Sequence, residues 1–265
     1  MTEVNGQYGN WALVAGAAEG IGEGFCVELA AAGFNIILVD QNTRAMHDLA
    51  IKTEKTYQVK TLEVNIDLAD PDAADRCMHV AASNDCRFLV YVAAFSRVCR
   101  FTNLDRAELD RFLSVNTRTL LHLVHGFSNR MISAGKTGGI IIVSSLAGLI
   151  GPQYVATYAA TKAFGIRLTE ALHEELWEHG IEITVCCAGT VSTPTYWKSK
   201  PSFKKMKPPV MQAIDVARYA IGQLGKKTIS IPGLTSRLQY FFLMKLIPSR
   251  LASRLVNNAM KKMYG

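Results

Sequence analysis

Apolar runs of strand length alternate with amphipathic stretches of helix length along most of this chain, from residue 11 onward. The short runs are rich in Val, Ile and Leu at consecutive positions, which is typical of strands that are buried on both faces. Because right-handed crossovers place the intervening helices over the sheet, this alternation predicts a parallel sheet. The predicted strands span residues 11–15, 35–40, 60–66, 87–93, 139–144, 181–187 and 228–231.

Helices are predicted between these strands, so the fold class is α/β. The expected architecture is a doubly wound parallel sheet of about seven strands with helices on both faces. A chain of 265 residues fits one such domain. The predicted helices span residues 20–32, 43–55, 71–82, 105–133, 153–178 and 212–224.

Charge is unevenly distributed along the chain. Residues 1–197 hold 15 Lys or Arg against 21 Asp or Glu, whereas residues 198–265 hold 14 against one. The last quarter is therefore a basic, apolar addition to an acidic body. It contains no recognised nucleic-acid-binding motif, so nucleic acid is not an expected partner.

Neither end of the chain predicts a targeting or membrane-spanning segment. The first residues hold no basic stretch followed by an apolar run. The longest apolar stretch near the C-terminus, residues 238–247, is about half of a membrane span and contains a lysine. The six cysteines form no C-x-x-C pair, which disfavours disulfides and zinc sites. We expect a cytoplasmic protein that is at most peripheral to a membrane.

The segment AGAAEGIG, residues 15–22, follows the first predicted strand and opens the first predicted helix. Its glycines allow a tight turn, close approach of a pyrophosphate and packing of the helix on the strand. The helix N-terminus offers free N–H groups to phosphates. This context predicts dinucleotide binding by a Rossmann-like fold, with contacts from Gly16, Glu19, Gly20, Ile21 and Gly22.

The next two strands predict the adenosine site. Asp40 ends the second strand, where a carboxylate accepts hydrogen bonds from ribose hydroxyls and repels a 2′-phosphate. Gln41 follows it where an NADP-dependent enzyme often carries arginine, so we expect NAD rather than NADP. Asp40 could instead cap the next helix, and Arg44 could weaken the preference for NAD over NADP. Asp67 and Leu68, after the third strand, are expected to contact the adenine.

Tyr158 and Lys162 lie four residues apart on a predicted helix, hence on one face of it. A neighbouring ammonium favours the phenolate and lowers the pKa of a phenol. Tyr158 could then exchange a proton with a substrate oxygen. Ser145 ends the fifth predicted strand, at the sheet edge where ligands collect, and its hydroxyl could orient the same oxygen.

With these residues, the chain resembles the short-chain dehydrogenase/reductase family over about residues 11–195. AGAAEGIG matches the family's T-G-x-x-x-G-x-G, and Tyr158 and Lys162 match its Y-x-x-x-K, with the serine at Ser145. The family's active-site asparagine falls on Asn116. The loop motif P-G-x-x-x-T appears as AGTVST, residues 188–193.

The resemblance implies a role for each of these residues. Tyr158 would be the general acid/base, while Lys162 would lower its pKa and bind the nicotinamide ribose. Ser145 would polarise the substrate oxygen. Asn116 would kink the long helix and hold a water that links Lys162 to solvent. Further implied cofactor contacts are Ala93, Ala94, Gly189, Val191 and Thr193.

Two positions depart from the family pattern. Ala15 replaces the threonine of the glycine motif, and residues 91–94 read Tyr-Val-Ala-Ala where the family has N-N-A-G. In the family these positions hydrogen-bond one another, so we expect an apolar replacement of one polar contact. Such a replacement is nearly neutral when both partners change together.

His122 and His125 lie three residues apart, but no third ligand follows at suitable spacing, so we expect no metal. They are expected at a helix-packing or subunit surface. The resemblance implies a homodimer or homotetramer.

The predictions divide the chain into a Rossmann domain over residues 1–232 and a basic amphipathic helical extension over residues 233–265. Pro248 should separate two helices in the extension. Three interpretations of the extension stay open: a packing helix for the domain or its subunit partner, a lid for a lipophilic substrate, or an anchor to an anionic membrane.

A substrate loop is predicted at about residues 190–212. It offers an apolar, aromatic set among lysines: Pro194, Tyr196, Trp197, Phe203 and Met206. This composition favours a large lipophilic alcohol or ketone, of hydroxysteroid or fatty-acyl type, and loosely resembles those branches of the family. The lysines could instead bind a carboxylate or a CoA phosphate.

The sequence therefore predicts an NAD(H)-dependent oxidoreductase that interconverts a secondary alcohol and a ketone. The alternative is a non-catalytic dinucleotide-binding or membrane-associated protein that retains the fold.

Overall fold

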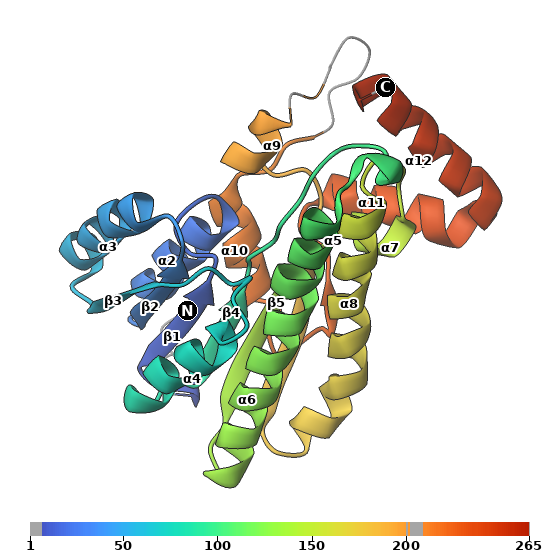
Figure 1. Cartoon of the computed structure of the whole chain (residues 1–265). Helices are drawn as coiled ribbons and strands as arrows, with labels where there is room; N and C mark the ends of the chain where they lie inside the picture. The colour runs from blue at the N-terminus through green and yellow to red at the C-terminus, as the bar shows by residue number, and fades with distance from the viewer. Residues whose placement is uncertain (1–6, 200, 202–208, 265) are drawn as a thin grey trace.

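A seven-stranded parallel sheet forms the centre of the computed structural model, which describes residues 7–199, 201 and 209–264 (Figure 1). The strand order is β3-β2-β1-β4-β5-β6-β7, so the chain reverses its direction of winding between β1 and β4. The strands are β1 (Trp11–Ala15), β2 (Asn35–Asp40), β3 (Thr61–Asn65), β4 (Phe88–Tyr91), β5 (Gly138–Ser145), β6 (Ile181–Ala188) and β7 (Ile229–Ser230).

Helices cover both faces of this sheet, as the alternation predicts. Successive strand residues alternate between the two cores: Leu13 and Ala15 of β1 pack on one side, and Ala12 and Val14 on the other. The first side is covered by α4 (Ala73–Ser83), α6 (Thr119–Ser133) and α8 (Ala156–Trp177), and α5 (Arg106–Leu113) packs against α8. The second is covered by α2 (Ile21–Ala31), α3 (Thr43–Tyr57) and α10 (Ala213–Ile221).

The helix predicted over residues 105–133 is divided. A π-helical turn, η2 (Ser114–Arg118), lies between α5 and α6. A π turn contains an extra residue and is often found at functional sites. It carries Asn116, whose side chain bonds to residues of a loop and of another helix. The turn lies where the family resemblance implied that Asn116 would kink the helix, whereas helical periodicity alone does not reveal it.

Three short helices are absent from the sequence prediction: η1 (Phe101–Asn103), α7 (Ala147–Ile150) and α9 (Pro194–Lys198). Each is too short for an amphipathic period to appear. The start of α9 has a local cause, since the Thr193 hydroxyl accepts a hydrogen bond from the Tyr196 N–H and proline occupies the first turn.

The C-terminal extension contains α11 (Leu234–Phe241), a π turn η3 (Phe242–Leu246) and α12 (Ser249–Tyr264), with Pro248 just before α12. In Figure 1, α12 lies at the same end of the molecule as α9. Asn257 on α12 bonds to both the main chain and the side chain of Gln153, and the Tyr264 hydroxyl lies 3.2 Å from the Ser199 hydroxyl. Within the described residues, no helix is long and apolar enough to cross a membrane.

Candidate active site

A pocket of about 800 Å³ opens at the carboxyl ends of β1 to β6. This is the edge at which parallel sheets of this type bind ligands, beside the point where the winding reverses. The pocket is lined by every cofactor and catalytic residue predicted from the sequence except Gly22 and Asn116. Gly22 packs against the Gly16 carbonyl, and Asn116 bonds to Phe95; both Gly16 and Phe95 line the pocket.

The turn after β1 requires glycine at two positions. A Cβ atom on Gly22 would lie 1.8 Å from the Gly16 carbonyl oxygen, and one on Gly16 would lie 2.7 Å from the Ala93 main chain. Gly16 also has a φ of 86°, which disfavours other residues. The turn therefore brings bare backbone to the pocket, next to the N-terminus of α2.

Asp40 lies at the end of the pocket where the sequence predicts the adenosine site. Its carboxylate accepts hydrogen bonds from the N–H groups of Ala18 and Asn42, each at 3.0 Å. Asn42, rather than Asp40, caps α3, since its side chain accepts from the Ala45 N–H. The alternative of a purely capping role for Asp40 is therefore wrong. Glu19 lies close by and accepts from the Asn42 amide at 2.9 Å.

Arg111 also lines the adenosine end, and sequence reasoning missed it. From α5 it donates to both carboxylate oxygens of Asp67, at 3.0 and 3.1 Å, and lies 3.3 Å from the Gln41 side-chain oxygen. Asp67 is therefore ion-paired rather than an isolated carboxylate. Arg111 lies 44 residues from Asp67 in the sequence, and no local pattern indicates that pairing.

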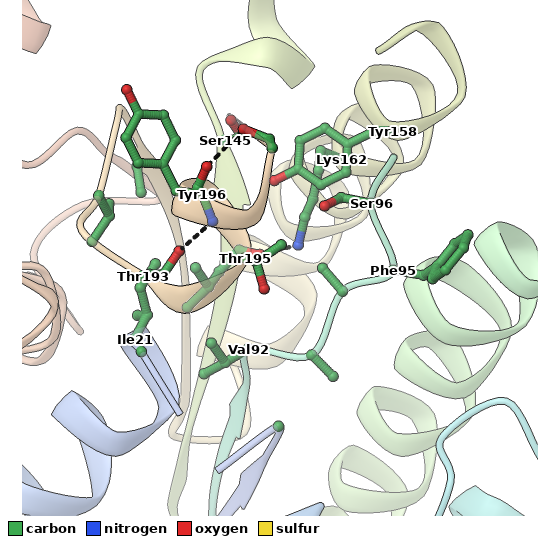
Figure 2. Close-up of a pocket in the computed structure, with 18 of the residues that line it drawn as sticks. Ile21, Val92, Phe95, Ser96, Ser145, Tyr158, Lys162, Thr193, Thr195 and Tyr196 are labelled. Atoms are coloured by element: carbon green, nitrogen blue, oxygen red, sulfur yellow. Dashed lines mark hydrogen bonds between the residues drawn. The ribbon is translucent and has the colours of Figure 1, made fainter. Parts of the chain in front are cut away.

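Tyr158, Lys162 and Ser145 come together above the end of β5, as their sequence positions predict (Figure 2). The Lys162 ammonium lies 5.8 Å from the centre of the Tyr158 ring and donates to the Val143 carbonyl at 2.8 Å. The Ser144 hydroxyl donates to the Lys162 carbonyl at 2.8 Å. These bonds fix the first part of α8 against β5.

Burial dominates the ionisation of this group. It raises the pKa of the Tyr158 phenol, and the neighbouring Ser145 hydroxyl acts in the opposite direction. It also lowers the pKa of Lys162 to about 8. The sequence predicts that Lys162 holds the pKa of Tyr158 below its usual value. In the protein without coenzyme that expectation is wrong, because burial raises the Tyr158 pKa. The sequence does not indicate this burial, which is nearly complete for Lys162 and partial for Tyr158.

Asn116 is only 3 % exposed, and both its amide nitrogen and its amide oxygen bond inside the protein. Its side-chain nitrogen donates to the Phe95 carbonyl and the Thr161 hydroxyl, each at 2.9 Å. Its oxygen accepts from the Phe95 N–H at 2.7 Å. Asn116 thus joins the loop after β4 to α8, one residue before Lys162.

The two departures from the family pattern lie side by side. Ala15 and Tyr91 are register partners in β1 and β4, and the N–H groups of Val92 and Ala93 both donate to the Ala15 carbonyl at 2.9 Å. The Tyr91 hydroxyl donates to the Val115 carbonyl in the π turn. The expectation of a purely apolar replacement is therefore wrong, because Tyr91 makes a polar contact in a different direction.

The outer part of the pocket is formed partly by α12. Met260, Met263 and Tyr264 line it together with Tyr196 of α9 and Val155. Of the residues predicted for the substrate loop, Phe203 and Met206 lie outside the described residues. Trp197 is half exposed and does not line the pocket.

The histidines predicted to have no metal role, His122 and His125, are exposed on α6, and His125 contacts the Asn129 amide. Across the described ranges, no group of three His, Cys, Asp or Glu residues could hold a metal ion.

Comparison with known proteins decides the family. The model of the short chain dehydrogenase family matches residues 10–203. This chain belongs to that family. It is therefore an oxidoreductase of the kind that acts on CH–OH groups, and the non-catalytic alternative is set aside.

Several relatives cover most of the chain. A 7beta-hydroxysteroid dehydrogenase of Clostridium sardiniense is 32% identical over 87% of this chain and 88% of its own length. One of Collinsella aerofaciens is 31% identical over 74% of each chain. A very-long-chain 3-oxoacyl-CoA reductase of Laccaria bicolor is 33% identical, over 66% of this chain and 53% of its own length.

Solved structures share the fold. A 7beta-hydroxysteroid dehydrogenase structure superposes with a TM-score of 0.88 at 26% identity, covering 96% of this chain and 98% of its own. A short-chain dehydrogenase from Sphingobium yanoikuyae in complex with NADPH has a TM-score of 0.77 at 22% identity, covering 90% and 96%.

The residues of the pocket fit the nicotinamide dinucleotide that this family binds. The bare backbone of the glycine turn leaves the space that a Cβ would fill, and a carboxylate follows at the end of β2. The Thr193 side chain lies over Gly20, where a Cβ would meet it at 2.9 Å, so the β6 loop covers the turn.

The buried ammonium of Lys162 should lower the stability of the protein near neutral pH. We expect Lys162→Met to increase the free energy of unfolding at pH 7 by about 2 kcal/mol, because the lost desolvation cost exceeds the lost hydrogen bond. The folded-state pKa is depressed, so the gain is present below about pH 8 and shrinks as the pH rises toward 10.5, the unfolded value. Urea unfolding at pH 7 and pH 10 measures this change. A variant less stable than wild type at pH 7 would contradict the burial argument.

Proposed function

We propose that this chain is an NAD(H)-dependent oxidoreductase that interconverts a secondary alcohol and a ketone on a large lipophilic substrate, of hydroxysteroid type or, less closely matched, fatty-acyl type. The observation that carries the proposal is the convergence of Tyr158, Ser145 and Lys162 at a pocket whose outer part includes the apolar side chains Met260 and Met263. The similarity to 7beta-hydroxysteroid dehydrogenases over most of the chain supports a steroid-like substrate.

Each catalytic side chain has a separate task in this proposal. In ketone reduction, the Tyr158 phenol gives its proton to the substrate oxygen as the C–H bond forms. In alcohol oxidation, the phenolate takes the hydroxyl proton as that bond breaks. The Ser145 hydroxyl donates to the same oxygen and orients it. When bound, the nicotinamide coenzyme supplies or accepts the hydride.

Lys162 acts on the charge of Tyr158. Lys162 carries its positive charge below about pH 8, and its ammonium is buried with its nitrogen 5.8 Å from the centre of the Tyr158 ring, so it stabilises the phenolate more strongly than a fully solvated ammonium would. The raised pKa of Tyr158 keeps the phenol protonated at neutral pH, which suits the acid role in reduction.

Asn116 is proposed to act from beneath the pocket. Its amide bonds align the loop after β4 with α8, which carries both Tyr158 and Lys162. A water held by Asn116 that links Lys162 to solvent remains part of the proposal.

Tyr158→Phe tests the acid/base assignment, because it removes the phenol oxygen and keeps the ring. We expect kcat to fall by about 10³-fold against a hydroxysteroid that the wild type oxidises, as for other lost general acids and bases. Formation of reduced nicotinamide is the measurement, with a panel of hydroxysteroids and long-chain secondary alcohols. Tyr57→Phe, on α3 and outside the pocket, is the control. Turnover by Tyr158→Phe at the wild-type rate would rule out the assignment.

Asp40 is the basis for proposing NAD rather than NADP. Its carboxylate and that of Glu19 place negative charge at the adenosine end, although the ion pair of Arg111 and Asp67 brings a guanidinium near. We expect wild type to bind NADH more tightly than NADPH, and Asp40→Ala to reduce that preference by roughly tenfold. Coenzyme titrations followed by nicotinamide fluorescence measure both affinities, with Asp48→Ala as a charge-matched control. Tighter binding of NADPH by the wild type would overturn this choice.

The C-terminal extension, residues 233–265, has a surface on which a membrane or a second subunit could bind. Exposed apolar side chains on α11, η3 and α12 stand beside basic residues, and no acidic residue occurs in residues 226–265. We propose that this surface contacts anionic membranes. We also propose that the chain forms a homodimer or homotetramer. The protein is proposed to be cytoplasmic. The exposed apolar residues are Leu234, Leu238, Phe241, Phe242, Leu246, Leu251 and Leu255.

Liposome flotation tests the membrane contact. The full chain should float with vesicles of phosphatidylcholine and phosphatidylserine but not with phosphatidylcholine alone, and Phe242→Gln should weaken flotation. Light scattering on the same samples gives the oligomeric state. If wild type does not float and Phe242→Gln instead dissociates an oligomer, the surface is a subunit contact and the membrane proposal is wrong.

A further inference from the structure

Tyr91 ends β4 beneath the pocket and is 2 % exposed. Its hydroxyl donates to the main-chain carbonyl of Val115. Burial raises the pKa of the Tyr91 phenol, so the hydroxyl remains a donor across the neutral range. Tyr91 does not line the pocket, so any effect it has on the chemistry must pass through other residues.

The carbonyl that Tyr91 contacts belongs to the π turn η2. A π turn shifts the main-chain bonding by one residue, and here the Thr119 N–H bonds to the Ser114 carbonyl five residues earlier. The Val115 carbonyl follows directly in the sequence and accepts a hydrogen bond from the Tyr91 hydroxyl. This bond gives a buried carbonyl a partner and joins the turn to β4.

The same turn carries Asn116, whose amide group bonds to the Phe95 main chain and to the Thr161 hydroxyl. The Thr161 hydroxyl in turn donates to the Tyr158 carbonyl at 2.9 Å. A continuous series of hydrogen bonds therefore runs from β4 through the π turn to the segment of α8 that holds the reactive side chains. Tyr91 stands at its beginning.

The neighbouring strand accommodates this arrangement. Ala15 is the register partner of Tyr91 and is fully buried, so a small side chain stands beside the Tyr91 ring. The two departures from the family pattern thus belong to one structural change. The polar contact expected between the strands is replaced by one between β4 and the π turn.

We propose that Tyr91 is a positioning residue: its hydroxyl fixes the π turn so that Asn116 holds α8, with Tyr158 and Lys162, in the geometry needed for proton transfer. This inference rests on the proposed roles of Tyr158 and Lys162. The rate of reaction then depends on Tyr91 although Tyr91 does not line the pocket.

Tyr91→Phe tests the inference, because it removes one hydroxyl and keeps the ring in the core. Tyr8→Phe is the matched control: Tyr8 is also buried, and its hydroxyl donates to Glu182, away from the pocket. Hydrogen exchange of residues 114–120, followed by mass spectrometry, reports on the turn without any substrate. Steady-state kinetics with a hydroxysteroid and coenzyme titrations report on the site.

We expect Tyr91→Phe to accelerate exchange in residues 114–120 and to lower kcat about tenfold, with KM and the Kd for NADH changed by less than about twofold. Tyr8→Phe should do neither. Unchanged kcat in Tyr91→Phe overturns the inference. A tenfold loss of NADH affinity, equal to the loss in kcat, would also overturn the inference. Faster hydrogen exchange throughout the sheet would do the same, since either result indicates general loosening of the core.

The result also separates this inference from the proposed function. If Tyr158→Phe is inactive while Tyr91→Phe behaves as wild type, only the positioning role fails. If Tyr158→Phe retains full activity, the proposed chemistry itself fails.

Discussion

A lysine ammonium buried beside a tyrosine phenol is the constraint on which the rest of this site depends. Removing Lys162 from water lowers its pKa to about 8, which is unfavourable for folding at neutral pH. A core selected only for stability would place an apolar residue there. The hydrogen bond to Val143 and the contact with Tyr158 show how the fold retains the charge, and the proposed proton transfer gives a reason for it.

The parallel sheet makes this arrangement available. All of its strands end at one edge, so residues distant in sequence meet there without long loops. The glycine turn, Asp40 and Ser145 each follow directly from a strand end. The helices supply the other side chains of the site. Tyr158 and Lys162 lie on α8, Arg111 lies on α5, and α12 lines the outer part of the pocket with apolar side chains.

Sequence predicts the strands well, because continuous apolar runs bounded by turns have few other interpretations. β1 and β2 begin and end where expected, and Tyr158, Lys162 and Ser145 meet as their spacing indicates. The features that escaped prediction depend on distant contacts. The pairing of Arg111 with Asp67 is of this kind. The family resemblance, but not helical periodicity, implied a kink at Asn116, and the sequence left open whether α12 would line the pocket. The direction of the Tyr158 pKa shift depends on burial, which spacing does not report. The catalytic roles and the domain boundary at residue 232 stay predictions.

The most direct test is an ultraviolet titration of the Tyr158 phenol, taken as the difference between wild type and Tyr158→Phe, with and without saturating oxidised coenzyme. The account predicts a phenol with a raised pKa in the protein alone, because of burial. With oxidised coenzyme bound, it predicts a pKa well below the usual value of about 10, because the positive charge of the oxidised nicotinamide adds to that of Lys162 near the phenol oxygen. An equally raised pKa in both states would contradict the account, since the phenol could not then form the phenolate that takes the proton in alcohol oxidation near neutral pH.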